Sequence, residues 1–146
     1  MEYRRFGSAY YIRTDKGEEV IDTILQVCKR EKIRSAVYTG IGGCDRAEVM
    51  TFDPEKGDFE SETVEGMLEL VSMNGNVMWD ESAGKPVHHT HALFTMKKDG
   101  EHRVIGGHMT SLRVLYTCET ELRPVEGGEI RKVYDPETGT GFWKLK

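Results

Sequence analysis

The chain of 146 residues has few of the features that mark cross-linked, secreted or membrane-spanning proteins. Its three cysteines are an odd number at wide, unrelated spacings, which is typical of reduced thiols and not of a disulfide framework or a zinc knuckle. No apolar run approaches the roughly 20 residues that cross a bilayer. Residues 1–19 lack the apolar segment of a secretory signal. We therefore expect a cytoplasmic protein without a membrane partner.

Positive charge is also scarce. The chain has 20 lysines and arginines against 25 acidic residues, which gives a net charge of -5. A protein that neutralises many phosphates needs clustered lysine and arginine. The nearest candidates are KREKIR at residues 29–34, which Glu31 interrupts, and Lys97–Lys98. We interpret the first as a solvated helix end and the second as an exposed hairpin tip, so the charge pattern does not predict nucleic-acid binding.

The residues that are present predict one α+β domain over residues 1–146, since no repeat, low-complexity segment or linker divides the chain. From Gly17 to Arg30 the apolar residues recur at the spacing of an amphipathic helix, which Thr14 or Asp15 could cap. After it, short β-branched and aromatic segments alternate with turn residues. One helix followed by about seven or eight strands predicts a largely antiparallel sheet that the helix covers.

Glycine-containing segments predict where the strands turn. Asn74-Gly75-Asn76 and Asp99–Gly100 are the best hairpin turns, because glycine tolerates the positive φ of tight turns. The stretch from Gly40 to Gly43 lacks the Lys-Ser/Thr of a phosphate-binding loop and leads into a strand. We expect it to be a strand end that bends or that meets another backbone.

All five histidines of the chain lie within residues 88–108. Counting back along both strands from a two-residue turn at Asp99–Gly100 places His91 opposite His108. Directly opposed residues on one face of a sheet have Cβ atoms about 4.5–5.5 Å apart. His89 lies two residues from His91 and therefore faces the same side. The sequence thus predicts that three imidazoles converge.

The same count separates the other two histidines from this group. His88 has the opposite parity and is predicted to face the other side of the sheet. His102 pairs with Lys97 at the hairpin tip, roughly 20 Å from His108. The glycines at residues 106–107 either leave space beside the cluster or let another backbone approach.

Three neutral imidazoles on one face, with a fourth position open, are the ligand set of a catalytic-type zinc site. Nitrogen ligands alone leave other divalent metals open. The alternatives are strand histidines that only form hydrogen bonds, or histidines at a subunit contact. We predict that His89, His91 and His108 hold zinc or another divalent metal, because an independent turn signal aligns all three.

Several segments resemble the plants and prokaryotes conserved (PPC) domain, a family labelled as predicted DNA-binding. They are GMLELVSMNGNV at residues 66–77, PVHHTHALF at 86–94 and VIGGHMTS at 104–111. The resemblance covers roughly residues 5–122, which leaves residues 123–146 as a C-terminal extension. It implies an α+β domain that assembles as a homotrimer, with the three histidines at a metal site.

In plants this domain follows an AT-hook, an Arg-Gly-Arg-Pro segment that enters the DNA minor groove. The Arg-Pro pair of this chain, Arg123–Pro124, is flanked by Leu122 and Val125 and is no such hook. The plant protein-contact stretch Gly-Arg-Phe-Glu-Ile-Leu reads GMLELV at residues 66–71. A trimer also lacks the two-fold symmetry that matches palindromic half-sites. DNA therefore stays open as a partner by the family label, without support from the charge.

The order His-x-His followed by Gly-Gly-His is also similar, more distantly, to that of acetolactate decarboxylase, in which three histidines hold zinc. There the metal polarises a ketone or carboxylate oxygen so that a carbanion-like charge can form. This resemblance supports a metal site better than it supports a reaction. If the protein is an enzyme, we expect metal-dependent lyase or hydrolase-like chemistry, and whether turnover occurs stays open.

Three hypotheses for the function follow. The first is a trimeric domain whose metal site binds or acts on a small molecule, with Glu69 and Glu119 as candidates to move a proton. Each glutamate equally fits a sheet residue that is ion-paired or faces solvent, and Arg13 fits either an anion-binding or a surface residue. The second is a DNA-associated regulator. The third is an assembly module with a structural metal, although structural zinc usually has four protein ligands.

Overall fold

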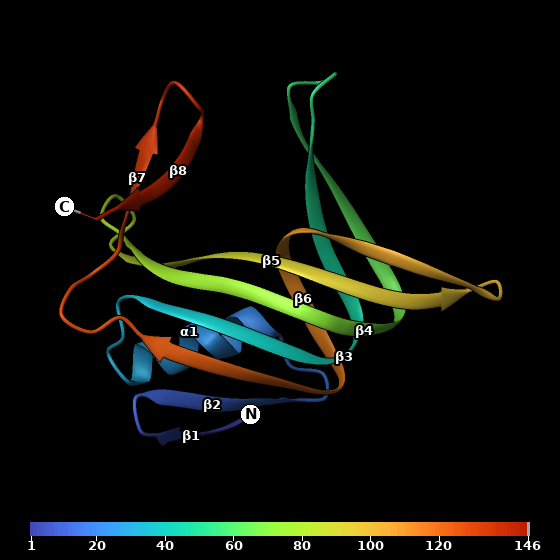
Figure 1. Ribbon diagram of the computed structural model, residues 1–146, viewed down its shortest axis with the longest axis horizontal. Helices are drawn as coiled ribbons and strands as arrows, with labels where there is room; N and C mark the ends of the chain where they lie inside the picture. Colours follow the sequence, from blue (N-terminus) through green and yellow to red (C-terminus); the bar gives the residue numbers. More distant parts are fainter. Residues whose placement is uncertain (146) are drawn as a thin grey trace.

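The computed structural model describes residues 1–145 as one sheet of eight strands covered on one face by one helix (Figure 1). The helix is α1 (Val20–Arg30), and the strands are β1 (Glu2–Phe6), β2 (Ala9–Asp15), β3 (Ala36–Asp53), β4 (Asp58–Asp80), β5 (Lys85–Lys98), β6 (Glu101–Pro124), β7 (Arg131–Asp135) and β8 (Thr140–Lys144). The strand order is β1-β2-β6-β3-β4-β7-β8, and β5 pairs with both β4 and β6. All pairs are antiparallel except β4–β7. The predicted α+β class is confirmed.

Helix α1 packs on the sheet through the apolar stripe that the sequence predicts. The spacing of its apolar residues puts them all on one side of the helix, and this side meets the sheet core. Its buried residues are Val20, Ile21, Thr23, Ile24, Val27 and Cys28. At 11 residues it is short, and no helix within residues 1–145 is long and apolar enough to cross a membrane.

The cap of α1 differs from the prediction. Its N-cap is Glu19, whose carboxylate accepts hydrogen bonds from the backbone N–H groups of Asp22 and of Leu112 in β6. Thr14 and Asp15 are not the cap, because both belong to β2, where the chain is still extended. The β1–β2 hairpin that holds them precedes the helix, whereas the sequence predicted strands only after it.

The strands are longer than predicted, and β4 continues where a turn was expected. Asn74-Gly75-Asn76 is not a turn, since β4 runs straight through it. A Cβ atom at Gly75 would lie 2.4 Å from the ring of buried Tyr38, so this glycine serves a close approach of a side chain. Gly42 lies in the stretch that was predicted to bend or to meet another backbone. A Cβ atom there would lie 2.5 Å from the carbonyl oxygen of Thr117, where the β3 and β6 backbones meet.

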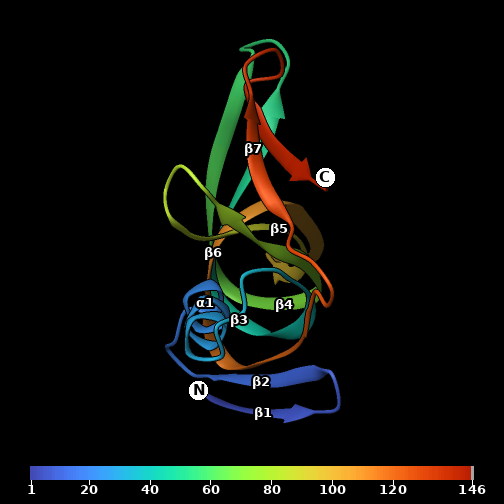
Figure 2. The same ribbon diagram turned by 90° about the vertical axis from the view of Figure 1, so that its left-hand side faces the viewer.

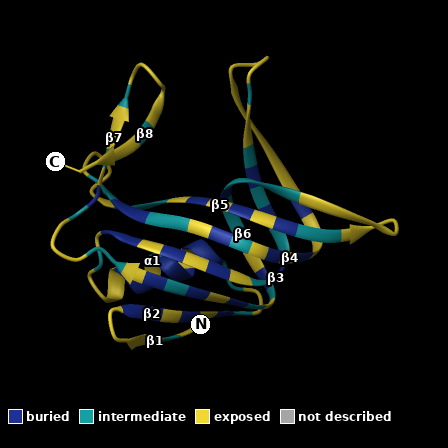
Figure 3. Ribbon diagram, viewed as in Figure 1, coloured by how far each residue is buried: buried dark blue, intermediate teal, exposed yellow. Residues whose placement is uncertain are grey.

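Two hairpin arms project from the sheet at the end remote from β1 and β2. One is the outer part of β3 and β4, and the other is β7–β8 (Figures 1 and 2). The burial pattern shows that the core lies where the sheet meets α1, whereas both arms are largely exposed (Figure 3). The arms therefore contribute little to the core and are free to form the walls of a site.

The face of the sheet away from α1 has no covering layer in the described chain. Large apolar side chains on it are exposed, among them Tyr11, Val37, Ile41 and Leu93. Exposed apolar patches on a sheet face mark contacts with another molecule. His89 and His91 lie on this same face, because Asn76 and Asn74 of β4 are their cross-strand partners and alternate with buried residues.

Candidate metal centre

The turn between β5 and β6 fixes the positions of the histidines. Asp99 and Gly100 have φ of 53° and 84°, the two positive values that a type I′ turn requires. From this turn the pairing runs without a shift back to His91, which lies opposite His108. The register that the sequence predicts is therefore confirmed.

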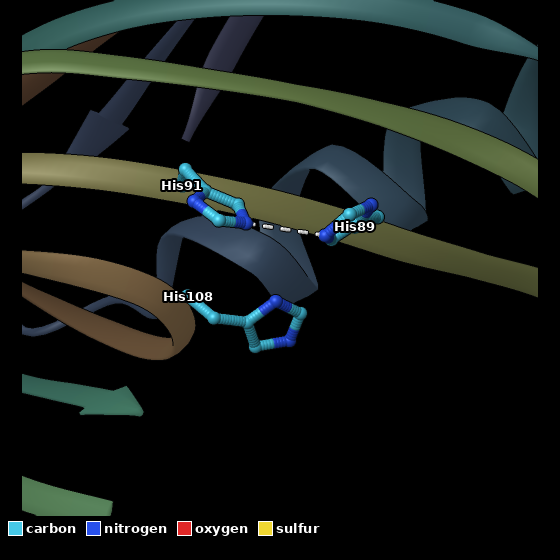
Figure 4. A group of neighbouring side chains, drawn as sticks. All are labelled: His89, His91 and His108. Carbon is cyan, nitrogen blue, oxygen red and sulfur yellow. Dashed lines mark hydrogen bonds between the residues drawn. The ribbon is translucent and has the colours of Figure 1, made fainter. Parts of the chain in front are cut away.

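The three predicted rings face one another (Figure 4). Their centroids are 5.1 Å apart for His89–His91, 5.0 Å for His89–His108 and 5.5 Å for His91–His108. One nitrogen from each lies within 4.8 Å of the others. The Nε2 atoms of His89 and His91 are 3.3 Å apart and share a hydrogen bond. That distance is about the edge of a tetrahedron with zinc–nitrogen bonds of roughly 2.0 Å, so the His89–His91 pair fits a zinc ion, and a nitrogen of His108 lies within 4.8 Å of both.

The glycines before His108 let other backbones approach, which was one of their two predicted roles. A Cβ atom at Gly106 would lie 2.6 Å from the carbonyl oxygen of Ala92, and one at Gly107 would lie 2.7 Å from that of Met50. These contacts draw β6 between β5 and β3 at the point where His108 begins to pair with β3. The third ring is thereby held against the other two.

The electrostatics favour the neutral form of the His108 and His89 rings. Burial, followed by repulsion from His89 and His91, lowers the pKa of the His108 imidazole from its usual 6.5 to about 4. Burial is also the main cause that lowers the pKa of His89, before His91 and Lys132. A neutral imidazole keeps the lone pair that a metal ion needs. At neutral pH the cluster is therefore ready to bind a cation.

This lowered pKa predicts how the stability of the metal-free protein depends on pH. Between pH 6.5 and about 4 the unfolded chain binds a proton at His108 that the folded chain does not bind, so acid favours unfolding. We expect the melting temperature in a chelator to fall more between pH 7 and pH 4.5 for the unmodified protein than for His108→Ala. Equal falls for the two proteins would contradict the lowered pKa.

The other two histidines lie where the count along the strands predicts. His88 faces the helix side of the sheet, where its Nδ1 is 2.9 Å from the hydroxyl of buried Thr90. That hydroxyl also hydrogen-bonds the phenol of Tyr38. His102 is exposed at the hairpin tip and pairs with Lys97. Neither ring belongs to the cluster.

The structure does not bring the two predicted glutamates to the histidines within one chain. Glu69 is exposed on β4 opposite Gly43, and Glu119 is exposed on β6 between Arg13 and Ile41. Neither side chain lines the histidine cavity. Arg13 itself forms ion pairs with the acidic residues of its own hairpin. The catalytic roles of these glutamates remain predictions.

The histidines open into a cavity of about 620 Å³ between the two arms. Phe52 and Phe59 of the β3–β4 arm form part of its wall, and their rings pack edge to face at 5.4 Å. The β7–β8 hairpin contributes Lys132, Thr140 and Gly141. Sequence reasoning missed these residues, because no local pattern links them to histidines far away in the chain.

Comparisons with known proteins agree with this architecture. The family model of the Plants and Prokaryotes Conserved (PCC) domain, also written PPC, matches residues 1–125. A protein of Ralstonia eutropha JMP134, provisionally named DNA-binding, is 28% identical with a TM-score of 0.86, over 99% of this chain and 96% of that one. No curated protein matches the chain.

Two archaeal structures are similar over nearly the whole chain. The metal-containing protein of Archaeoglobus fulgidus is 30% identical with a TM-score of 0.81, over 98% of this chain and 96% of that one. The PPC protein of Pyrococcus horikoshii is 28% identical with a TM-score of 0.82, over 99% and 94%. The comparisons do not show the resemblance to acetolactate decarboxylase. By its sequence and its fold, the protein belongs to the Plants and Prokaryotes Conserved domain family.

Proposed function

We propose that the protein binds a divalent metal ion, zinc by preference, at His89, His91 and His108, and that this ion in turn binds a small molecule. The observation that carries the proposal is the convergence of the three ring nitrogens within 4.8 Å of one another. The Archaeoglobus fulgidus relative described as metal-containing supports it. Two ligands are exposed and one is half-buried, so a molecule can reach the site from solvent.

The ligand set favours an open site over a structural one. Three protein ligands leave a position for a further ligand, and no acidic or cysteine side chain lines this cavity in the described chain. A divalent ion bound here would supply a Lewis acid that polarises a carbonyl or carboxylate oxygen. The phenyl rings of Phe52 and Phe59 offer an apolar wall to the rest of the molecule. Lyase or hydrolase-like chemistry is the reaction class that such a site would support.

We further propose a homotrimer that assembles through the uncovered sheet face. The exposed side chains of Tyr11, Val37 and Ile41 provide an apolar contact surface on that face. Glu69 of β4 and Glu119 of β6 are also exposed, so only assembly would bring either of them to a histidine cluster. Light scattering should give about three times the 16.6 kDa of one chain. A monomer at every concentration would contradict the trimer.

The three buried, unpaired cysteines suit a cytoplasmic location.

Metal analysis tests the metal site directly. After equilibration with zinc and removal of excess metal, we expect one zinc per chain. The matched control is His102→Ala, which removes an exposed histidine of the same hairpin outside the cluster. That variant should keep its zinc. If the unmodified protein retains no zinc, or if the His102→Ala protein retains none, the proposed site is wrong.

A second candidate function, nucleic-acid binding, has one structural observation in its favour. Lys29, Lys32, Arg34, Lys85 and Trp79 are among the residues that line a cavity of about 640 Å³ between α1 and the β4–β5 turn. The Arg34 guanidinium carbon lies 4.0 Å from the centre of the Trp79 ring. Lysines around an aromatic ring are what single-stranded nucleic acid needs for phosphate contact and base stacking. The KREKIR segment, interpreted above as a solvated helix end, forms one rim of this cavity.

Binding of a labelled oligonucleotide over a salt series tests this second candidate. If the protein acts on nucleic acid, replacing Lys29, Lys32 and Lys85 by glutamine should reduce both the affinity and its salt dependence. Glutamine at Lys97 and Lys98, on the hairpin tip, is the control for lost charge elsewhere. No binding at low salt would remove this candidate and leave the metal site unaffected.

A further inference from the structure

The β7–β8 hairpin lies outside residues 1–125, which the family model matches, and yet it borders the histidine site. Contacts with β4 hold it there. Strand β7 pairs in parallel with the end of β4, where Lys132 lies opposite Asp80. The indole N–H of Trp143 donates a hydrogen bond of 3.3 Å to the side-chain oxygen of Asn76. Asn76 is the cross-strand partner of His89, so the hairpin is anchored one strand away from the cluster.

Lys132 is the residue of this hairpin that carries charge to the site. Its side chain lines the cavity together with the three histidines. A Cβ atom at Gly141, on the neighbouring strand β8, would lie 2.3 Å from the Cε of Lys132. The glycine therefore leaves the space that the lysine stem occupies. Its Nζ is 4.0 Å from the carboxylate of Asp80, the outer limit of an ion pair, so the ammonium is only weakly neutralised.

The cavity lining carries positive charge, whereas the chain as a whole is acidic. The whole sequence carries a net charge of -5, yet among the described residues the lining of this cavity includes no aspartate or glutamate. Lys132 is its one lysine or arginine. Neutral imidazoles leave the charge of a bound divalent ion uncompensated. Ion and lysine together would make a strongly cationic site, and an anionic ligand is what neutralises it.

We propose that Lys132 determines ligand specificity. Its ammonium would bind an anionic group of a small carboxylic acid, while the metal binds another oxygen atom of the same molecule. This inference rests on the proposed metal site and adds the substrate class. A carboxylic acid fits better than inorganic phosphate, because the cavity of about 620 Å³ and the exposed rings of Phe52 and Phe59 also accommodate an organic part.

Titration of the cobalt-loaded protein with oxalate tests this role, because the visible absorption of cobalt reports changes in its ligands without any turnover. Lys132→Met keeps the stem and removes the charge. We expect it to take up cobalt at least as well as the unmodified protein and to bind oxalate about 10- to 100-fold more weakly, the loss typical of one charge-assisted hydrogen bond. Lys132→Arg should restore most of the affinity, and Lys98→Met at the hairpin tip is the matched control.

Gly141→Val provides a second variant that leaves Lys132 in the chain but displaces its stem. It should weaken oxalate binding and leave cobalt uptake unchanged. Unchanged oxalate affinity in Lys132→Met, or a preference of the unmodified protein for phosphate over oxalate, would overturn the inference while the metal site stands. Failure of the unmodified protein to take up cobalt would instead overturn the proposed metal site, and this inference with it.

Discussion

The His108→Ala protein should bind zinc at least about 100-fold more weakly than the unmodified protein. Loss of a partner that only supports a metal ligand already costs about 10- to 100-fold in affinity, and this substitution removes a ligand itself. His108 is also the one ligand from β6, whereas His89 and His91 both come from β5. Without it, two exposed rings on a single strand remain. Competition against a chromophoric chelator measures the difference.

His102→Ala again serves as the control, since it removes an imidazole from the same strand as His108 but far along the hairpin. Both variants should stay folded in a chelator, as judged by circular dichroism, because His108 is only half-buried and contributes no apolar core packing. If His108→Ala binds zinc as tightly as His102→Ala does, the three rings are not a common ligand set.

The second large effect is expected at Gly75, where alanine should destabilise the fold by about 2–6 kcal/mol. A Cβ atom there would overlap the ring of Tyr38, whose hydroxyl is hydrogen-bonded to Thr90 in the buried layer. Overpacking costs about 1–3 kcal/mol. Breaking a buried hydrogen bond to let the ring move costs about 1–3 kcal/mol more. The melting temperature should fall by about 10 °C.

Gly128→Ala is the matched control for this substitution. A Cβ atom at Gly128 would meet nothing within 4 Å, and its backbone is not left-handed. We expect a change in stability within about 0.5 kcal/mol. Gly75 also lies opposite Thr90, the residue between His89 and His91 in β5. The loss of stability should therefore come with weaker zinc binding. Similar melting temperatures for the two variants would mean that the Tyr38 ring is not held as described.

The part of the site that the sequence could predict is the part that one local signal controls. Two residues with positive φ, Asp99 and Gly100, set the register, and parity then places every histidine of the two strands on one face or the other. No bulge interrupts β5 and β6 between this turn and His91. The count along the strands therefore holds over the whole distance.

The same reasoning failed where a contact with a residue distant in sequence decides the local conformation. Gly75 looks like a turn residue between two asparagines, but it lies in a strand under a ring from β3. Thr14 and Asp15 have the side chains of helix caps, but pairing with β6 keeps them extended. In both cases a tertiary contact decides between conformations that local propensity allows.

The cavity around the histidines depends entirely on such distant contacts. Lys132 reaches the cluster because β7 pairs with β4, and Trp143 anchors the hairpin on Asn76. The sequence of a short hairpin after the last long strand does not indicate which strand the hairpin will pair with. The three-histidine cluster was therefore predictable from the sequence, and the residues of the cavity around it were not.

X-ray absorption spectroscopy of the zinc-loaded protein tests the central claim most directly. We expect three imidazole nitrogens at about 2.0–2.1 Å, with oxygen ligands completing the shell. Sulfur at about 2.3 Å, or a shell with fewer than three imidazoles, would contradict a centre built from His89, His91 and His108.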